Sequence, residues 1–168
     1  MGSSYTEFRG KGFWSRDHLL EAWLRTLTLQ MGDDVYQPGW QHELRDYWWS
    51  ISGGCFQGCI WASLDDFLAD GDRVAFILRA SERSIESLRA FGPYVPAAFL
   101  NAIGLSSGTD WPIQWFERIA DHFNALLRGE LSTDASTGPV LPATRKGQRW
   151  DEIEQPRQAQ TAPPRSPE

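Results

Sequence analysis

The feature that most constrains the fold is an amphipathic segment near the N-terminus, from Ser15 to Gly32. Its apolar side chains recur every three or four residues, the period of a helix with one buried face; they are Leu19, Leu20, Trp23, Leu24 and Leu27. Ser15 is a good N-cap, Asp17 would lie in the first turn, and Gly32 would end the helix. The rest of the chain must supply elements that cover this face, and Trp23 is expected in the core.

An aromatic stretch precedes this helix, and it is interrupted by glycine. Tyr5, Phe8 and Phe13 are separated by Gly10 and Gly12. Apolar and polar residues do not alternate here with the period of two that marks a half-buried strand. The stretch is therefore predicted to be a loop that anchors itself through its rings.

Further capped amphipathic runs follow along the chain. They predict helices over residues 38–52, a short helix capped by Ser63, a long helix from Asp72 to 91, and helices over 95–103 and 110–129. The apolar residues 55–61 are interpreted as a buried connector or an irregular helical turn. The predicted fold class is all-α: a single-domain antiparallel helical bundle of about six helices.

The composition changes after Leu131. Six of the ten prolines lie in residues 132–168, among Ser, Thr, Gln and Arg. Such a segment buries too little apolar surface to offset its loss of conformational entropy on ordering. The predicted organisation is a helical domain over residues 1–131 and a disordered Pro-rich tail over 132–168.

The net charge of −6 lies entirely in residues 1–131, which hold 11 Lys or Arg and 17 Asp or Glu. An acidic body argues against nucleic-acid binding, which requires basic surfaces, and permits a basic protein partner. The N-terminus has no secretory pattern, and no stretch is long and apolar enough to span a membrane. A cytoplasmic protein is expected.

Catalytic, metal and cofactor motifs are weak. Cys55 and Cys59 are expected to be buried thiols, because a metal site would need further ligands. Residues 42–46, HELRD, are similar to a zinc-protease helix in which Asp46 replaces the second histidine. No catalytic residue, metal or cofactor is predicted. The alternative is a small helical hydrolase or metalloenzyme that uses His42 and Asp46.

Several motifs resemble those of bacterial toxin-immunity proteins encoded beside contact-dependent or type VI secreted toxins. They are FRGKGFW at residues 8–14 followed by Asp17, the pair Trp23-Leu24, FLN at residues 99–101 followed by Trp111, and LRGE at residues 127–130. The resemblance covers roughly residues 5–131. It implies a cytosolic, non-enzymatic protein that binds and neutralises one cognate toxin by direct contact, and it leaves the oligomeric state open.

Acidic residues near helix ends are the candidates for binding this partner. Asp65, Asp66 and Asp72 are also explained by helix starts, whereas Asp33 and Asp34 would follow a helix C-terminus, where the dipole disfavours anions. Large aromatic residues close to them would supply buried contact area. The full candidate set is Asp33, Asp34, Tyr36, Trp40, Asp65, Asp66, Asp70 and Asp72.

Overall fold

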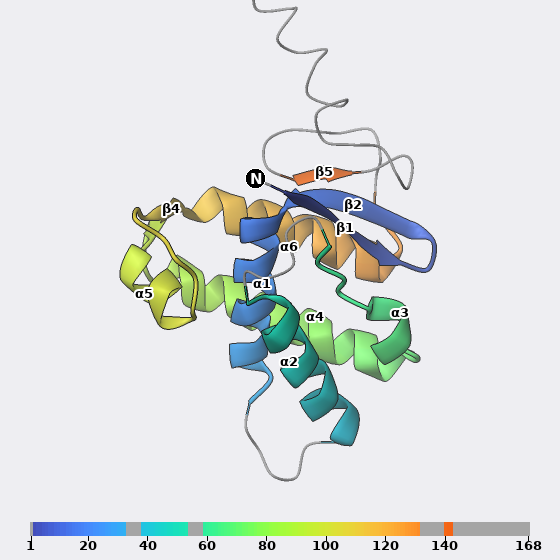
Figure 1. Ribbon diagram of the computed structural model, residues 1–168. Helices are drawn as coiled ribbons and strands as arrows, with labels where there is room; N and C mark the ends of the chain where they lie inside the picture. Colours follow the sequence, from blue (N-terminus) through green and yellow to red (C-terminus); the bar gives the residue numbers. More distant parts are fainter. Residues whose placement is uncertain (1, 33–37, 54–58, 132–139, 143–168) are drawn as a thin grey trace, which may run out of the picture.

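The computed structural model describes residues 2–32, 38–53, 59–131 and 140–142, and within them helices combine with two small antiparallel sheets (Figure 1). The helices are α1 (Asp17–Gln30), α2 (Gly39–Ile51), α3 (Leu64–Phe67), α4 (Gly71–Arg89), α5 (Ala97–Ala102) and α6 (Ile113–Arg128). The strands are β1 (Ser3–Phe8), β2 (Lys11–Arg16), β3 (Tyr94–Val95), β4 (Trp111–Pro112) and β5 (Val140–Pro142).

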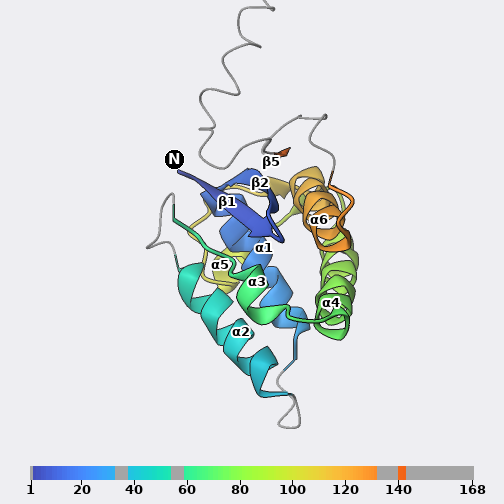
Figure 2. The same cartoon turned by 90° about the vertical axis from the view of Figure 1, so that its right-hand side faces the viewer.

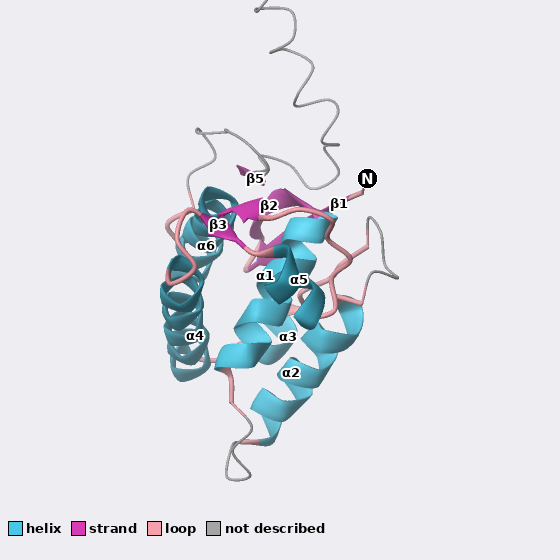
Figure 3. Ribbon diagram, turned by 90° about the vertical axis from the view of Figure 1, so that its left-hand side faces the viewer, coloured by secondary structure: helices cyan, strands magenta, loops and turns pink. Residues whose placement is uncertain are grey.

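The all-α prediction is wrong, because the predicted N-terminal loop is a β-hairpin of β1 and β2. Buried and half-buried residues alternate regularly in β1, but the buried ones are Ser4, Thr6 and Phe8. Two of the three are polar, so the burial pattern does not appear as a hydrophobic pattern in the sequence. Figure 3 shows the hairpin across one end of the helices.

A two-residue turn joins the hairpin strands. Phe8 pairs with Lys11, and the intervening Arg9 and Gly10 have φ angles of 51° and 75°. Positive φ at both central positions is the requirement of a type I′ turn, whose twist matches that of the flanking strands. Beyond the turn, the Tyr5 ring lies so close to Gly12 that a Cβ there would collide with it.

Helix α1 begins at Asp17, so the prediction that Ser15 caps it is wrong. Ser15 is a buried residue of β2, and Arg16 occupies the N-cap position, where its side chain does not cap the helix. The Asp17 N–H instead donates to the carbonyl oxygen of Gly2 (3.2 Å). The hairpin therefore supplies the cap that a side chain was expected to provide.

The core is built around α1, which packs against α2, α4 and α6 (Figures 1 and 2). The prediction that Trp23 is core is confirmed, since its exposed fraction is 0%. The Phe123 ring on α6 meets Trp23 edge-on at 6.1 Å and Trp48 of α2 at 6.4 Å between centroids. This aromatic cluster joins three helices, and edge-to-face pairs of this kind add to the stabilisation from buried area.

Two of the later predictions at helix starts need correction. The N-cap of α4 is Asp70 rather than Asp72, and its carboxylate accepts a hydrogen bond from the Arg73 N–H (2.9 Å). Ser63 precedes α3 but makes no capping hydrogen bond. The second sheet, β3 with β4, joins the segments before α5 and α6.

Part of the predicted tail belongs to the first sheet. Val140–Pro142 forms β5 and pairs antiparallel with Phe13–Ser15 of β2, so the strand order is β1-β2-β5. The remainder of residues 132–168 lies outside the described residues. Among the helices of the described chain, none combines the length and the apolar character needed to cross a bilayer.

Candidate functional site

A groove of about 410 Å³ lies where the hairpin meets α2, α3 and the connector before α3. We call it the acidic groove. Three carboxylates, two aromatic rings and two small or apolar side chains line it: Glu7, Asp65, Asp66, Tyr47, Trp61, Ser63 and Leu64. It combines the two properties expected of the partner site, negative charge and large aromatic side chains.

The hairpin contributes Glu7 of β1 to the groove, and Asp65 holds the hairpin turn beside it. Both carboxylate oxygens of Asp65 accept from the Arg9 N–H, at 3.0 and 3.2 Å. The Arg9 guanidinium lies 4.7 Å from the centroid of the Phe8 ring. Asp65 therefore lies in the first turn of α3 and also fixes the position of the hairpin turn, which is 56 residues away in the chain.

Hydrogen bonds to the backbone fix the opposite wall. The Tyr47 hydroxyl donates to the carbonyl oxygen of Trp61 (2.7 Å) and accepts from the Ser63 hydroxyl (3.0 Å). The indole N–H of Trp48 donates to the carbonyl oxygen of Ala62 (2.8 Å). The connector backbone is thus tied to α2, while the Trp61 side chain stays 64% exposed.

Residues with strained backbone conformations lie at the acidic groove. In the described part of the chain two non-glycine residues have positive φ, Arg9 at 51° and Ser63 at 48°. The first forms the turn beside the groove and the second lines it. Left-handed conformations cost a residue with a Cβ roughly 1–2 kcal/mol, and such strain tends to occur at functional sites.

The electrostatics of the groove are negative. Asp66 is exposed, and among the described residues no hydrogen bond or ion pair joins its carboxylate to another residue. Glu7 acts on its neighbour Tyr5: burial raises the pKa of the Tyr5 hydroxyl, and the charge of Glu7 raises it further. A cation placed in the groove would therefore meet carboxylates and an exposed ring together.

The other predicted partner residues are placed elsewhere or not described. Asp33, Asp34 and Tyr36 lie outside the described residues. Trp40 is half-buried on α2, edge-on to the Phe76 ring at 5.5 Å and beneath the Arg73 guanidinium. Asp70 caps α4, and Asp72 is exposed in its first turn. Of the eight candidates, the acidic groove brings together Asp65 and Asp66.

Sequence reasoning missed Glu7, Tyr47 and Trp61 as site residues. Glu7 reaches the groove because β1 is a strand, which the pattern did not predict. Tyr47 is partly buried against the core on α2, so its place in the sequence pattern does not distinguish it from a core residue. The one available signal was Trp61, an aromatic residue four positions before the pair Asp65 and Asp66.

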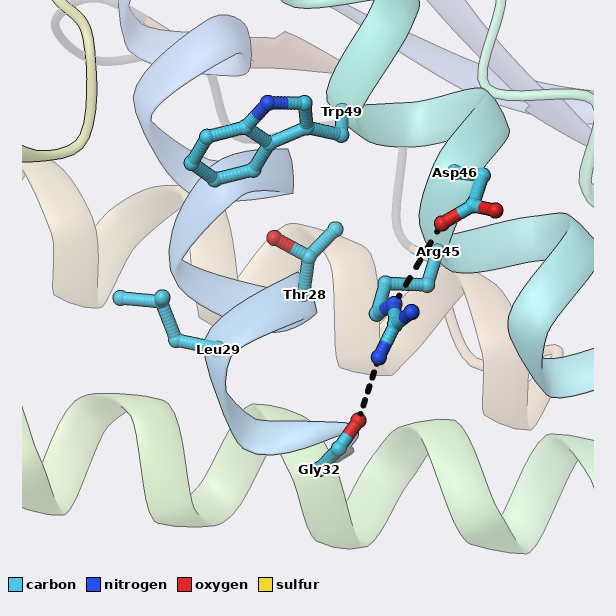
Figure 4. A pocket seen from close by; sticks show the side chains of 6 residues that line it. All are labelled: Thr28, Leu29, Gly32, Arg45, Asp46 and Trp49. Atoms are coloured by element: carbon cyan, nitrogen blue, oxygen red, sulfur yellow. Dashed lines mark hydrogen bonds and ion pairs between the residues drawn. The ribbon is translucent and has the colours of Figure 1, made fainter. Parts of the chain in front are cut away.

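A second hollow of about 400 Å³ lies between the C-terminal half of α1 and α2 (Figure 4). Arg45 crosses it, donating from Nη1 to the carbonyl oxygen of Gly32 (2.9 Å) and pairing with Asp46 at 3.5 Å. Asp46 is one of the two residues, with His42, that the alternative hydrolase or metalloenzyme hypothesis would use. Over the described ranges, no three His, Cys, Asp or Glu residues gather closely enough to hold a metal ion.

Cys59 is exposed, contrary to the expectation of a buried thiol, and Cys55 lies outside the described residues.

Three charged side chains are buried along α1, away from the groove. Asp17 accepts from the Ser4 hydroxyl (2.7 Å), and one buried oxygen of Glu21 has no hydrogen-bond partner among the described residues. Arg25 donates to the backbone oxygens of Ser52 (2.8 Å) and Ile103. Burial lowers the pKa of the Arg25 guanidinium, and the negative charge of Glu21 opposes this shift. These groups connect α1 to β1, α2 and α5.

Comparisons with known proteins found no match for this chain among protein-family models, curated proteins or solved structures.

Proposed function

We propose that this protein is an immunity-type binding protein, which neutralises a cognate bacterial toxin in the cytoplasm by direct contact through the acidic groove. The observation that carries the proposal is the composition of that groove. The exposed Trp61 ring, the exposed Asp66 carboxylate and Glu7 line one hollow whose walls are fixed by hydrogen bonds. The motifs that resemble immunity proteins support the same function.

The groove suits a basic and partly apolar segment of a partner. Carboxylates attract a Lys or Arg side chain during diffusional encounter and fix its orientation. A tryptophan face adds a cation–π contact and apolar area, and tryptophan is enriched among residues that dominate binding energy. Because the groove walls are fixed before binding, little conformational entropy is lost when the partner binds.

The proposal is tested with the variable C-terminal domain of the large secreted protein expected to be encoded directly upstream. Association is measured for the unaltered chain and for Asp66→Lys and Trp61→Ala. Trp61→Ala keeps the backbone carbonyl that Tyr47 binds, so the fold should be retained. We expect at least a tenfold loss of affinity for Trp61→Ala, and for Asp66→Lys slower association that depends less on salt.

Asp72→Lys is the matched control. Asp72 is also an exposed aspartate in the first turn of a helix, so the substitution changes net charge and helix-dipole energy in the same way. It should leave association close to that of the unaltered chain. Equal losses for Asp66→Lys and Asp72→Lys would mean that only net charge matters, and no binding by the unaltered chain would refute the immunity function.

A further inference from the structure

Strand β5 sets the direction in which the chain continues from the first sheet. It is antiparallel to β2, and its last residue, Pro142, lies opposite Phe13. At Pro142 the chain therefore runs along β2 toward the turn end of the hairpin. Helix α3 and the acidic groove lie at this end, where the Asp65 carboxylate accepts from the Arg9 N–H (Figure 1).

The eight residues after β5 have a charge opposite to that of the groove. Residues 143–150 have the sequence ATRKGQRW, with three positive charges and no negative charge. The cations are Arg145, Lys146 and Arg149, and the first acidic residue after β5 is Asp151. The part of the C-terminal sequence that follows β5 directly is therefore purely basic.

The distance from β5 to the groove is within the reach of this segment. The turn residue Gly10 is three positions from Phe13 along β2, which is about 10 Å at the rise of a strand. Strand β1 is two strand spacings from β5, which is also about 10 Å. An extended chain covers at most about 14 Å from Pro142 to Lys146 and about 25 Å to Arg149. The segment is long enough to pass the turn and reach the groove.

The groove offers what an arginine or lysine side chain requires. Glu7, Asp65 and Asp66 supply carboxylates around a hollow of about 410 Å³, and the Trp61 side chain that lines it is 64% exposed. A guanidinium can stack on an aromatic face while it donates to a carboxylate. Exposed charge pairs are weak, but a segment on a short tether is present at an effective concentration in the millimolar range. Docking within the chain therefore needs only modest affinity.

We propose that residues 143–150 dock in the acidic groove through their arginine and lysine side chains and compete there with a partner. The docking itself is independent of any toxin, because it uses the charges of this chain alone. Its consequence for binding rests on the proposed function: a basic segment of the toxin meets the same carboxylates and the same Trp61 ring. The apparent affinity of the groove for that segment is reduced by the fraction of molecules in which residues 143–150 are docked.

The test uses the full chain with a nitroxide spin label on Cys59, whose thiol is exposed two residues before Trp61. Cys55→Ser removes the other cysteine of the chain, so that one site is labelled. The label broadens the backbone amide resonances of residues that approach it, and NMR measures this against the reduced label. Asp66→Lys alters the groove. Asp72→Lys is its matched control, since it makes the same charge change in the first turn of another helix.

The basic segment is altered in the same paired way. Arg145→Gln with Lys146→Gln removes two positive charges from residues 143–150. Arg157→Gln with Arg165→Gln also removes two, but from the sequence beyond the proposed contact. The two variants therefore have the same net charge and differ in where the charge is lost.

We expect the label to broaden the resonances of residues 143–150 in the labelled chain and in both controls. The broadening should be at least about twofold smaller in Asp66→Lys and in Arg145→Gln with Lys146→Gln, and it should decrease as salt screens the charges. The proposal is overturned if Asp66→Lys and Asp72→Lys give the same broadening, or if the two variants of the C-terminal sequence do. No toxin is present in this experiment, so its failure is distinct from a failure of the immunity function.

Discussion

Arg25 is a buried cation whose guanidinium joins three helices, and its replacement should be costly. Arg25→Ala would leave the carbonyl oxygens of Ser52 and Ile103 without their donor, and the buried Glu21 without a nearby positive charge. Removing one partner from a buried charged network costs about 3–5 kcal/mol. We expect a loss of this size in the free energy of unfolding, measured by urea denaturation. The coupling to Glu21 is tested with Arg25→Met. In the double variant Arg25→Met with Glu21→Gln, the loss of unfolding free energy should be smaller than in Arg25→Met alone, because no uncompensated charge of this pair remains. Additive losses would contradict this coupling.

The hairpin is the element whose stability should respond most directly to alkaline pH, through Tyr5. Its ring lies over Gly12 and 5.3 Å from that of Trp14, and burial and then the charge of Glu7 raise the pKa of its hydroxyl above 10.0. The folded state therefore binds the proton more tightly than the unfolded state. The stabilisation is complete below about pH 10, the pKa of the unfolded chain, and is lost as pH rises through the folded pKa. Tyr5→Phe should lose less stability than the unaltered chain between pH 9 and 11, measured by thermal unfolding in the same buffers. An identical pH dependence in both proteins would show that Tyr5 does not contribute.

The helices could be predicted from the sequence, and the hairpin could not, for a physical reason. α2 and α6 have apolar side chains at helical spacing. Pro38 precedes α2 and Gly129 follows α6, so the hydrophobic period and the residues that bound a helix predict the same segments. β1 buries Ser4 and Thr6, and its pairing with β2 depends on the turn at Arg9 and Gly10 rather than on hydrophobic alternation. The hairpin brings Glu7 to α3 in the acidic groove. Asp65 and Asp66 were therefore predicted as partner-binding residues, whereas Glu7 was not, because its position depends on the hairpin.

At the scale of the whole molecule, the aromatic cluster of Trp23, Trp48 and Phe123 should make α1, α2 and α6 unfold as one unit. Trp23→Ala would open a large cavity beside Phe123 in this cluster, and such changes cost about 3–5 kcal/mol. Trp23→Phe is the matched control: it keeps a ring against Phe123 and removes a buried indole N–H that has no hydrogen-bond partner among the described residues. It should therefore cost clearly less than Trp23→Ala. Unfolding is followed by far-ultraviolet circular dichroism for the helices and by tryptophan fluorescence for the core. The two transitions should coincide in all three proteins and shift together. A Trp23→Ala protein whose fluorescence transition moves while its helical transition stays in place would show that the three helices are not one cooperative unit.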